Sequence, residues 1–491
     1  MVKTLKNIAM LLFVAVVTSL VSCKNKETCY LNFPVTAALV ADWGESTTLS
    51  FTYRNAEVVE VRTITGGWKA DLDRAARTVT ITAPESESAE DAERTGSIHI
   101  VAVAKGGDSE GAVISARIVD GVVDLSANGA QSNCYIVPSP NSKYRFNACV
   151  KGNSSESIPT VKVGIVWIDS PSNLEHLTLE KDGYASFFVN YETDADGKQL
   201  DTSPKGNAVI AAYDSSGTIL WSWHLWLTGG DNPCDGITLS NGKTLMGYNL
   251  GAWSNPNGSI STVDIWEGYG LYYQWGRKDP FLRPEYYDCA KTIDETVYNA
   301  TSDYTYVTVK ATDAKIGTIE YAVKHPLTFI SSTEDNAGNW LYDNNRTDLW
   351  SENGPKSLYD PCPYGWRVPS KNVFDVLDIA SAEDNLPLED AEKLYGWALT
   401  DSGNGEKHFF TANGYRSYLT GVLSNINYRD EYPYTPKPWV GYYWTAGVGS
   451  KASLSTAMYF DLNTSRATVN GYKAVTDQKR GNAMQVRCVK E

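Results

Sequence analysis

The chain has 491 residues, of which 42% are hydrophobic and 12% aromatic, and its formal net charge is -15. At about 100–200 residues per domain, this length predicts about three domains with ordinary apolar cores. No basic stripe offsets the acidity, so duplex nucleic acid and anionic membrane surfaces are excluded as expected partners. The simplest interpretation of the charge is solubility.

Residues 1–22 have the pattern of an export signal, a positively charged start followed by an apolar stretch over 8–21 that is short for a membrane span. The stretch ends in Leu20-Val21-Ser22-Cys23, which resembles a bacterial lipobox. The resemblance implies that Cys23 becomes a diacylated N-terminus and that 23–29 is a lipid-anchored linker. An ordinary secretory signal with a chance cysteine is the alternative.

Two or three acyl chains on Cys23 would hold the protein stably at a membrane, because one chain alone binds only marginally and a second makes the anchoring stable. We therefore expect a lipoprotein of the outer membrane that contacts the membrane through its lipid alone. The residues that follow, Lys24-Asn25-Lys26-Glu27, lack the acidic run that directs some lipoproteins of gut and oral Bacteroidetes to the cell surface. Exposure at the cell surface is left open.

Residues 30–120 predict a first all-β module. Apolar and polar residues alternate with period two over 47–53, 77–82 and 97–101, as expected for half-buried strands of a small sandwich. The motifs that carry a family resemblance here are Gly67-Trp68-Lys69-Ala70, residues 78–81 and residues 94–98. They resemble the Bacteroidetes-associated BACON module, whose members often act as spacers. We expect Trp68 to be a core residue rather than a sugar platform.

Residues 121–230 predict a second β-sandwich. Its strongest signal is a hairpin, in which strand-like runs over 208–213 and 218–226 flank a Gly-containing turn. Trp221 and Trp223 lie on one face of the second run and Trp226 lies on the other. Aromatic residues on both faces predict a strand that is buried on both sides. The alternative is an exposed tryptophan strip that stacks on sugars.

Residues 231–491 contain five signature segments rich in glycine and aromatic residues. They are 245–252, 270–281, 360–369, 441–445 and 486–490. In this order they resemble the Fibrobacter succinogenes major paralogous domain. The resemblance implies an α+β, C-type-lectin-like domain with small sheets, a few helices and long loops. The chain departs from the family in reading Met246-Gly247-Tyr248-Asn249 where Met-Asp-Arg-Asn is common, which puts any salt bridge of that pair in doubt.

Three prolines in 359–370 fix φ and predict an extended segment inside this last domain. Ser370 could cap a helix through about Ala380, with Val373, Phe374 and Leu377 on one face. Further helices are expected over 387–395 and over 316–324, the latter stopped by Pro326.

Eight cysteines leave seven after lipidation of Cys23, an odd number for an oxidising compartment. No C-x-x-C pair occurs, which excludes zinc ribbons and thioredoxin-type redox sites. Cys362 and Cys488 flank much of the last domain and are the preferred disulfide. Cys134 and Cys149, on successive strand-like segments, could also pair.

No familiar catalytic or nucleotide-binding motif occurs, and the five histidines are not clustered. We therefore predict no catalytic residue, no metal ligand and no cofactor. The Glu-Pro-Asn, Gln-Pro-Asp and Trp-Asn-Asp motifs of calcium-dependent lectins are also missing. A related enzyme of the formylglycine-generating type would need a catalytic cysteine pair or a copper site, and Cys289 and Cys362 lack that context.

The segment 425–438 alternates tyrosines with charges and prolines and has no apolar periodicity. We predict that it is a stiff surface loop and that Tyr428, Tyr432, Tyr434 and Trp439 form part of a ligand surface. The alternative is that these aromatic residues fold back and cover their own domain.

The sequence as a whole predicts two all-β sandwich modules followed by an α+β, C-type-lectin-like domain. The function expected is non-catalytic binding of a glycan or a surface protein, in adhesion or glycan capture. The alternative is a structural or tip component of a fimbria-like surface assembly.

Overall fold

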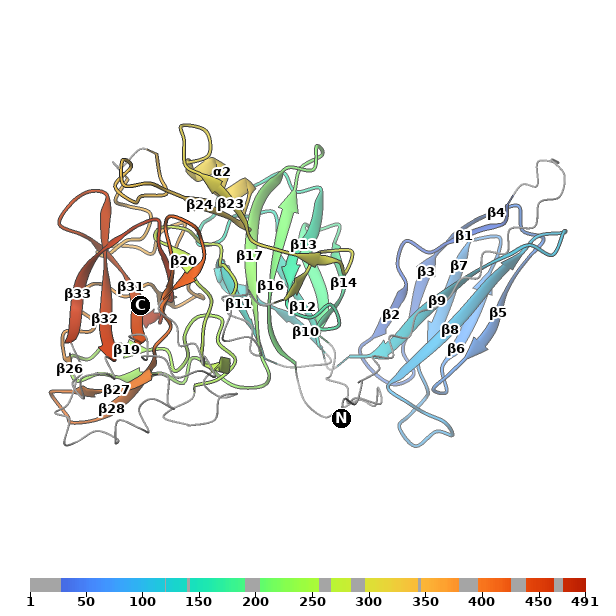
Figure 1. Cartoon of the computed structure of the whole chain (residues 1–491). Coiled ribbons are helices and arrows are strands. Elements are labelled where there is room, and N and C mark those ends of the chain that lie inside the picture. Colours follow the sequence, from blue (N-terminus) through green and yellow to red (C-terminus); the bar gives the residue numbers. More distant parts are fainter. Residues whose placement is uncertain are drawn as a thin grey trace, which may run out of the picture. The chain divides into compact units, whose positions relative to one another are not determined.

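The computed structural model describes residues 28–119, 121–138, 142–189, 204–255, 266–283, 296–342, 346–378, 396–424, 439–462 and 471–491. The chain divides into two compact units, Met1–Ile118 and Val119–Glu491, which are taken one at a time below. Nearly all of the regular structure is β-strand, arranged in many sheets (Figure 1). The β-sandwich part of the predicted fold class is thereby confirmed. The C-type-lectin-like part stays a prediction.

The first unit is a small β-sandwich, as the period-two alternation predicts. Its sheets are β1 (Tyr30–Asn32) with β4 (Thr52–Arg54); β2 (Ala37–Val40), β9 (Ser109–Ile118), β8 (Thr95–Val103) and β5 (Val58–Ile64); and β3 (Ser46–Ser50), β7 (Thr78–Thr82) and β6 (Lys69–Asp73). In β7 the residues Val79 and Ile81 are fully buried while their neighbours are half-buried. Trp68 is 4% exposed and lies in the same core, which confirms its expected role.

The second unit begins with another sandwich of two sheets. The smaller sheet contains β10 (Val122–Asp124), β12 (Lys143–Asn147), β15 (Tyr184–Val189) and β14 (Leu174–Leu179). The larger contains β11 (Cys134–Val137), β17 (Ile219–Thr228), β16 (Lys205–Tyr213), β13 (Lys162–Ile168), β21 (Val297–Tyr298) and β22 (Tyr304–Thr305). A 3-10 turn, η1 (Ala127–Gly129), lies between β10 and β11. The predicted hairpin is β16 and β17, which pair antiparallel.

Strand β17 is buried on both faces, as the sequence predicts. Trp221 and Trp223 point into the sandwich and pack in its core. Trp226 points to the other side, into a second core built mainly from residues after 240. All three indole rings are at most 1% exposed, so they are core residues and do not form an exposed strip.

This burial explains why residues 119–491 form one compact unit. The segments 121–230 and 231–491, expected as separate modules, share the larger sheet, because β21 and β22 extend it beyond β13. The expected border near 120 falls within two residues of the border between units, whereas the structure places no border between units near 230.

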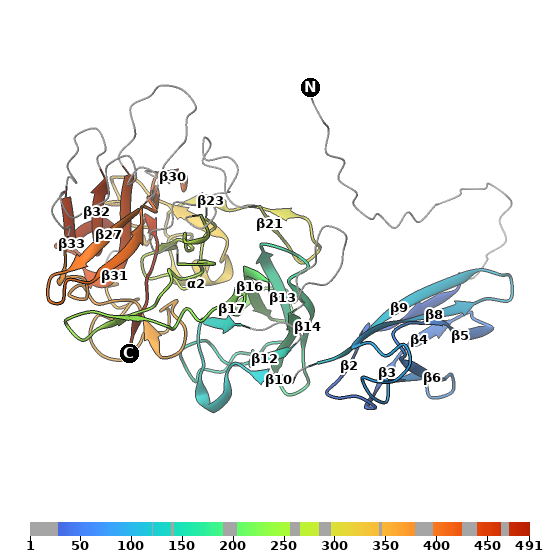
Figure 2. The same ribbon diagram turned by 90° about the horizontal axis from the view of Figure 1, so that it is seen from below.

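The rest of the second unit is made of short strands and long connections. Its sheets are β18 (Ile237–Thr238), β19 (Thr244–Leu245), β35 (Val489–Lys490) and β25 (Trp366–Arg367); β20 (Tyr273–Gln274), β34 (Ala483–Met484), β29 (Tyr415–Arg416) and β30 (Leu423–Ser424); β23 (Thr308–Ala311) and β24 (Thr328–Ser331); β26 (Leu377–Asp378), β27 (Gly396–Asp401) and β28 (Lys407–Thr411); and β31 (Trp439–Val448), β32 (Leu454–Leu462) and β33 (Gly471–Lys479). Figure 2 shows the last of these sheets close to β27.

The helix expected over 316–324 is present as α2 (Ile319–Lys324), which begins three residues later than predicted. The hydroxyl of Thr318 caps it by accepting the N–H of Tyr321 at 3.1 Å. Pro326 follows the end of the helix, as expected. Across the described residues, no helix combines the length and the apolar character that crossing a membrane requires.

The helix predicted from Ser370 to about Ala380 is wrong for the described part of that range. Val373 and Leu377 each bond the carbonyl three residues back, as in turns. Leu377 and Asp378 then form β26, which pairs with β27. The apolar side chains do enter the core, but pairing with β27 overrides their helical spacing. The helix expected over 387–395 lies outside the described residues.

Candidate functional site

Most of the predicted site residues outside the disulfide cannot be placed. Cys23, Tyr428, Tyr432 and Tyr434 lie outside the described residues. Trp439 opens β31, but its side chain is also outside the described part. Lipidation and the tyrosine-rich ligand surface therefore stay predictions.

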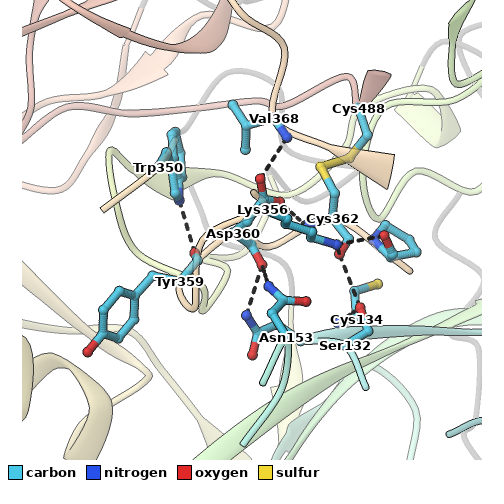
Figure 3. The surroundings of a disulfide bond; sticks show 12 residues. Ser132, Cys134, Asn153, Trp350, Lys356, Tyr359, Asp360, Cys362, Val368 and Cys488 are labelled. Atoms are coloured by element: carbon cyan, nitrogen blue, oxygen red, sulfur yellow. Dashed lines mark hydrogen bonds between the residues drawn. A yellow bond between two sulfur atoms is a disulfide. The ribbon is translucent and has the colours of Figure 1, made fainter. Parts of the chain in front are cut away.

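The structure joins Cys362 and Cys488 in a disulfide with a Cα–Cα distance of 6.1 Å (Figure 3). Both cysteines are fully buried. The bond links the proline-rich segment 359–370 to the residue just before β35. Cys134 and Cys149, the other pair considered from the sequence, are both free.

Asp360 organises the turn that carries this disulfide. Its carboxylate accepts the backbone N–H groups of Cys362 and Val368, both at 2.9 Å. Burial raises the pKa of Asp360, and the nearby ammonium of Lys356 acts in the opposite direction. The Lys356 ammonium donates to the carbonyls of Cys362 and Pro363. Figure 3 shows these groups gathered around the disulfide.

Side chains from the sandwich hold the same segment from the other side. Asn133 and Asn153 each donate a side-chain N–H to the carbonyl of Asp360 at 2.8 Å. Ser132 donates its hydroxyl to the carbonyl of Cys362 at 3.2 Å. The extended segment is therefore fixed between the sandwich and the C-terminal strand, and it acts as a structural hub.

The signature segments of the C-terminal region interlock through their aromatic residues. Trp444 donates its indole N–H to the carbonyl of Tyr273 at 2.8 Å, and Trp275 donates to the carbonyl of Thr445 at 3.1 Å. Trp275 and Trp444 are completely buried. These residues therefore build the core and are not available as a ligand surface.

One hollow of the second unit lies beside α2 and has a volume of about 10 Å³. Its lining includes Lys278, whose ammonium contacts the carbonyl and hydroxyl of Ser222 at 2.9 and 2.6 Å and the carboxylate of Asp279 at 2.6 Å. An ammonium has three donors, and all three are engaged by these atoms. The ammonium of Lys278 therefore has no donor left for a ligand.

A second hollow, which we call the Asn249 hollow, has a volume of about 10 Å³. This is about the space that one water molecule needs, and far less than the roughly 300–1,000 Å³ of pockets for drug-sized ligands. Its lining consists of Gly247, Tyr248, Asn249, Ser254, Asn255, Gly268, Phe409, Thr411 and Arg487. It brings aromatic rings, hydroxyl and amide groups and a guanidinium together around that small space.

Backbone carbonyls fix the guanidinium of Arg487 in this hollow. It donates to the carbonyls of Met246, Gly247 and Phe409 at 2.9, 2.7 and 2.8 Å. Burial lowers the pKa of Arg487 to about 10, so the group stays charged near neutral pH. Within the described residues it forms no ion pair.

Nothing in the described parts of the chain brings three or more His, Cys, Asp or Glu side chains together as a metal site. His224, on β17, is 2% exposed, and its Nε2 lies 2.9 Å from the amide oxygen of Asn207. Burial lowers its pKa to about 3, so the imidazole is neutral. This histidine is a core residue.

Sequence reasoning missed the Asn249 hollow. In the sequence, Gly247 and Tyr248 stand out only as a departure from a family pattern. The hollow also needs Phe409, Thr411 and Arg487, which lie more than 150 positions further along the chain. The sequence signal was Gly247 in that departure. The structure explains it, because a Cβ at this position would lie 2.6 Å from the carbonyl oxygen of Asp235.

No protein-family model and no curated protein matches the chain. Among solved structures, SporoSAG from Toxoplasma gondii is similar at 13% identity, over 39% of this chain and 95% of that chain, with a TM-score of 0.13. The D00-D0 domain of Intimin is similar at 10% identity over 40% and 96%, with a TM-score of 0.13. The Ig1-2 module of the Drosophila receptor protein tyrosine phosphatase DLAR is similar at 12% identity over 41% and 99%, with a TM-score of 0.15. Likenesses with TM-scores this low carry no conclusion about function.

Proposed function

We propose that this chain is an exported, lipid-anchored and non-catalytic binding protein of the outer membrane. In this proposal the second unit captures a glycan or a surface protein. The main observation behind a non-catalytic role is that buried charged side chains bond to the protein itself and stabilise its fold. Asp360, Lys278 and Arg487 all bond to backbone or side-chain groups of the protein. A disulfide-pinned scaffold of this kind suits the presentation of loops and small hollows for recognition.

The anchor is tested by acylation. We expect radiolabelled palmitate to enter the wild-type protein and to be absent from Cys23→Ala, because the thiol of Cys23 is the only acylation site that the lipobox pattern implies. Cell fractionation should find the wild type in the outer membrane. A wild-type protein that fractionates as a soluble periplasmic protein would show that the anchor is wrong.

The binding role is tested on an array of glycans and, separately, on candidate surface proteins. Once a ligand is found, we expect Tyr434→Ala combined with Trp439→Ala to abolish its binding and to shift the melting temperature by only a few degrees. The reason is that the segment 425–438 lacks apolar periodicity, so its aromatic residues should be at the surface. Tyr306→Ala, which changes a tyrosine that is 65% exposed, is the matched control and should bind normally.

A different result identifies the alternative. If these aromatic residues cover their own domain, the same double variant should lose about 3–5 kcal/mol of unfolding free energy for each buried ring. A double variant that binds at full affinity would exclude the tyrosine-rich patch whatever its stability. A wild-type protein that binds neither glycans nor surface proteins would contradict the proposed function itself.

A further inference from the structure

We propose that one end of the first unit rests on the lipid headgroups of the membrane and binds their phosphate groups through Arg54, Arg74 and Arg77. This inference rests on the lipid anchor of the proposed function, and it goes beyond the expectation that the protein contacts the membrane through its lipid alone. The surface concerned, which we call the entry end, consists of Tyr30, Tyr53 and the turns over 54–57, 73–78 and 104–108.

The entry end is the place where the chain enters the first unit. Cys29, just before β1, donates its backbone N–H to the carboxylate of Asp108 at 3.0 Å. Asp108 directly precedes β9, and the unit ends at Ile118, the last residue of β9. This strand has 10 residues, which at ~3.3 Å per residue separates its two ends by about 30 Å (Figure 2). The chain therefore enters and leaves the unit at opposite ends.

The three arginines are brought to the entry end by the fold. Arg54 is the last residue of β4, and Arg74 and Arg77 lie in the turn between β6 and β7. The guanidinium of Arg54 lies 4.9 Å from the ring centroid of Tyr30, its direct partner across β1 and β4. Those of Arg74 and Arg77 lie 5.9 and 5.5 Å from the ring centroid of Tyr53. Because these segments are separated in the sequence, no basic run announces this cluster.

These guanidinium groups have donors to spare. All three arginines are exposed, and within the described residues none of them forms an ion pair. Arg74 donates to the backbone carbonyl of Glu57 at 2.8 Å, whereas Arg54 and Arg77 contact only the tyrosine rings with their side chains. An arginine has five N–H donors in a planar fork that matches the oxygens of a phosphate group. The entry end thus offers a set of phosphate donors that the described part of the protein leaves unused.

The two tyrosines suit the same environment. Tyr30 is exposed and Tyr53 is half-buried. A tyrosine combines an apolar ring with a polar hydroxyl, and such side chains are enriched at the level of membrane headgroups. The rings also hold the guanidinium groups in place by cation–π contact.

The charge balance of the entry end is positive, although the whole chain carries -15. Its turns contain three carboxylates, those of Glu57, Asp73 and Asp108, against the three arginines and Lys105. Two of these carboxylates accept backbone N–H groups: Asp73 those of Ala75 and Ala76, and Asp108 that of Cys29.

The opposite end of the unit is strongly acidic. The segment 85–93 contains five carboxylates, and the carbonyl of the next residue, Arg94, accepts the N–H of Ile118 at 2.8 Å. This segment therefore lies at the end where the chain leaves the unit. An anionic membrane repels the acidic end and attracts the entry end, which turns the arginines towards the headgroups.

The anchor makes this contact intramolecular. Tyr30 lies seven positions after Cys23, and an extended chain spans at most ~3.6 Å per residue, so the entry end stays within about 25 Å of the acylated residue. A short tether gives a high effective concentration, so individually weak contacts are sufficient. The phosphate of a neighbouring lipid is therefore favoured over free phosphate in solution.

The first test maps the surface on the acylated wild-type protein, so it does not depend on the folding of a variant. Phenylglyoxal modifies exposed guanidinium groups, and mass spectrometry follows the rate at each arginine. The protein is compared in vesicles of phosphatidylethanolamine and phosphatidylglycerol and in a non-ionic detergent. We expect Arg54, Arg74 and Arg77 to react several-fold more slowly in the vesicles. Arg62, an exposed arginine of β5, is the internal control and should react at the same rate in both.

The second test measures sedimentation of the mature chain from residue 24 on, which carries no lipid, with the same vesicles and with vesicles of phosphatidylcholine alone. We expect weak, salt-sensitive binding to the anionic vesicles only. Arg54→Gln, Arg74→Gln and Arg77→Gln together should weaken it by about tenfold or more.

The matched control removes the same charge from three exposed cations elsewhere, as Arg62→Gln, Lys69→Gln and Lys243→Gln. It should stay within about twofold of the wild type. Melting temperatures are recorded for both triple variants.

Three results would overturn the inference and leave an anchored binding protein standing. They are equal phenylglyoxal rates of the three arginines in vesicles and detergent, an equal slowing at Arg62, and an equal loss of vesicle binding in both triple variants. Protection by inorganic phosphate in detergent, with none from vesicles, would overturn it in favour of a site for free phosphate. A wild-type protein without an acyl chain, which the palmitate experiment detects separately, would contradict the anchor of the proposed function and this inference with it.

Discussion

Replacing Cys362 and Cys488 together by alanine should lower the free energy of unfolding of the second unit by about 2–5 kcal/mol. The disulfide joins residues 126 positions apart, and in the chain-entropy model a cross-link that closes a loop this long restricts the unfolded chain strongly. It also pins the structural hub of Asp360 to the last strand of the chain. The double replacement adds no new free thiol, whereas a single replacement would leave the partner cysteine unpaired.

Chemical denaturation under oxidising and reducing conditions measures this effect. Reduction should destabilise the wild type and leave the double variant unchanged. Cys149→Ala is the matched control, since Cys149 is a half-buried free cysteine, and it should cost much less. Equal denaturation midpoints for the wild type and the double variant, with equal slopes, would show that the cross-link contributes nothing to stability.

Local patterns in the sequence predicted local structure well. Alternation with period two predicted the strands of the first unit, and two β-rich runs around Gly217 predicted the hairpin of β16 and β17. Aromatic residues on both faces predicted a strand buried on both sides. These features are decided by neighbours along the chain or by direct strand pairing, so one sequence contains enough information.

Other features depend on contacts between distant residues, and there the sequence was insufficient. The spacing of Val373, Phe374 and Leu377 suits a helix, yet pairing with β27 placed Leu377 in a strand. The border expected near 230 is not a border between units, because β21 from the next segment continues the sheet of β13. Neither contact leaves a signal in the local pattern.

Contacts between distant residues also explain why the candidate site could not be predicted from the sequence. Asn249 lies in a recognisable segment, but its free acceptor follows from where Gly268 and Gln485 place their oxygens. In the sequence, Arg487 is simply a cation near the end of the chain. Only the fold shows that its guanidinium donates to three backbone carbonyls and forms no ion pair among the described residues. Concave sites are assembled from several distant segments, so their geometry appears only with the fold.

Trp226→Ala should destabilise the second unit by about 3–5 kcal/mol, the usual cost of removing a large buried aromatic side chain. The indole is completely buried in the core that joins β11, β13 and β16 of the sandwich to the C-terminal region. It also donates its N–H to the carbonyl of Ala252 at 2.8 Å. The variant therefore loses packing and a hydrogen bond at the place where both halves of the unit meet.

Trp226→Phe separates these two contributions, because it keeps most of the ring volume and removes the donor. We expect it to cost about 1–3 kcal/mol, the penalty for leaving the Ala252 carbonyl without its partner. Both variants should unfold residues 119–491 in one cooperative transition, since sandwich and C-terminal region share this core. Two separate transitions in calorimetry, with only one shifted by Trp226→Ala, would mean that the sandwich and the C-terminal region are independent folding units and that Trp226 does not couple them.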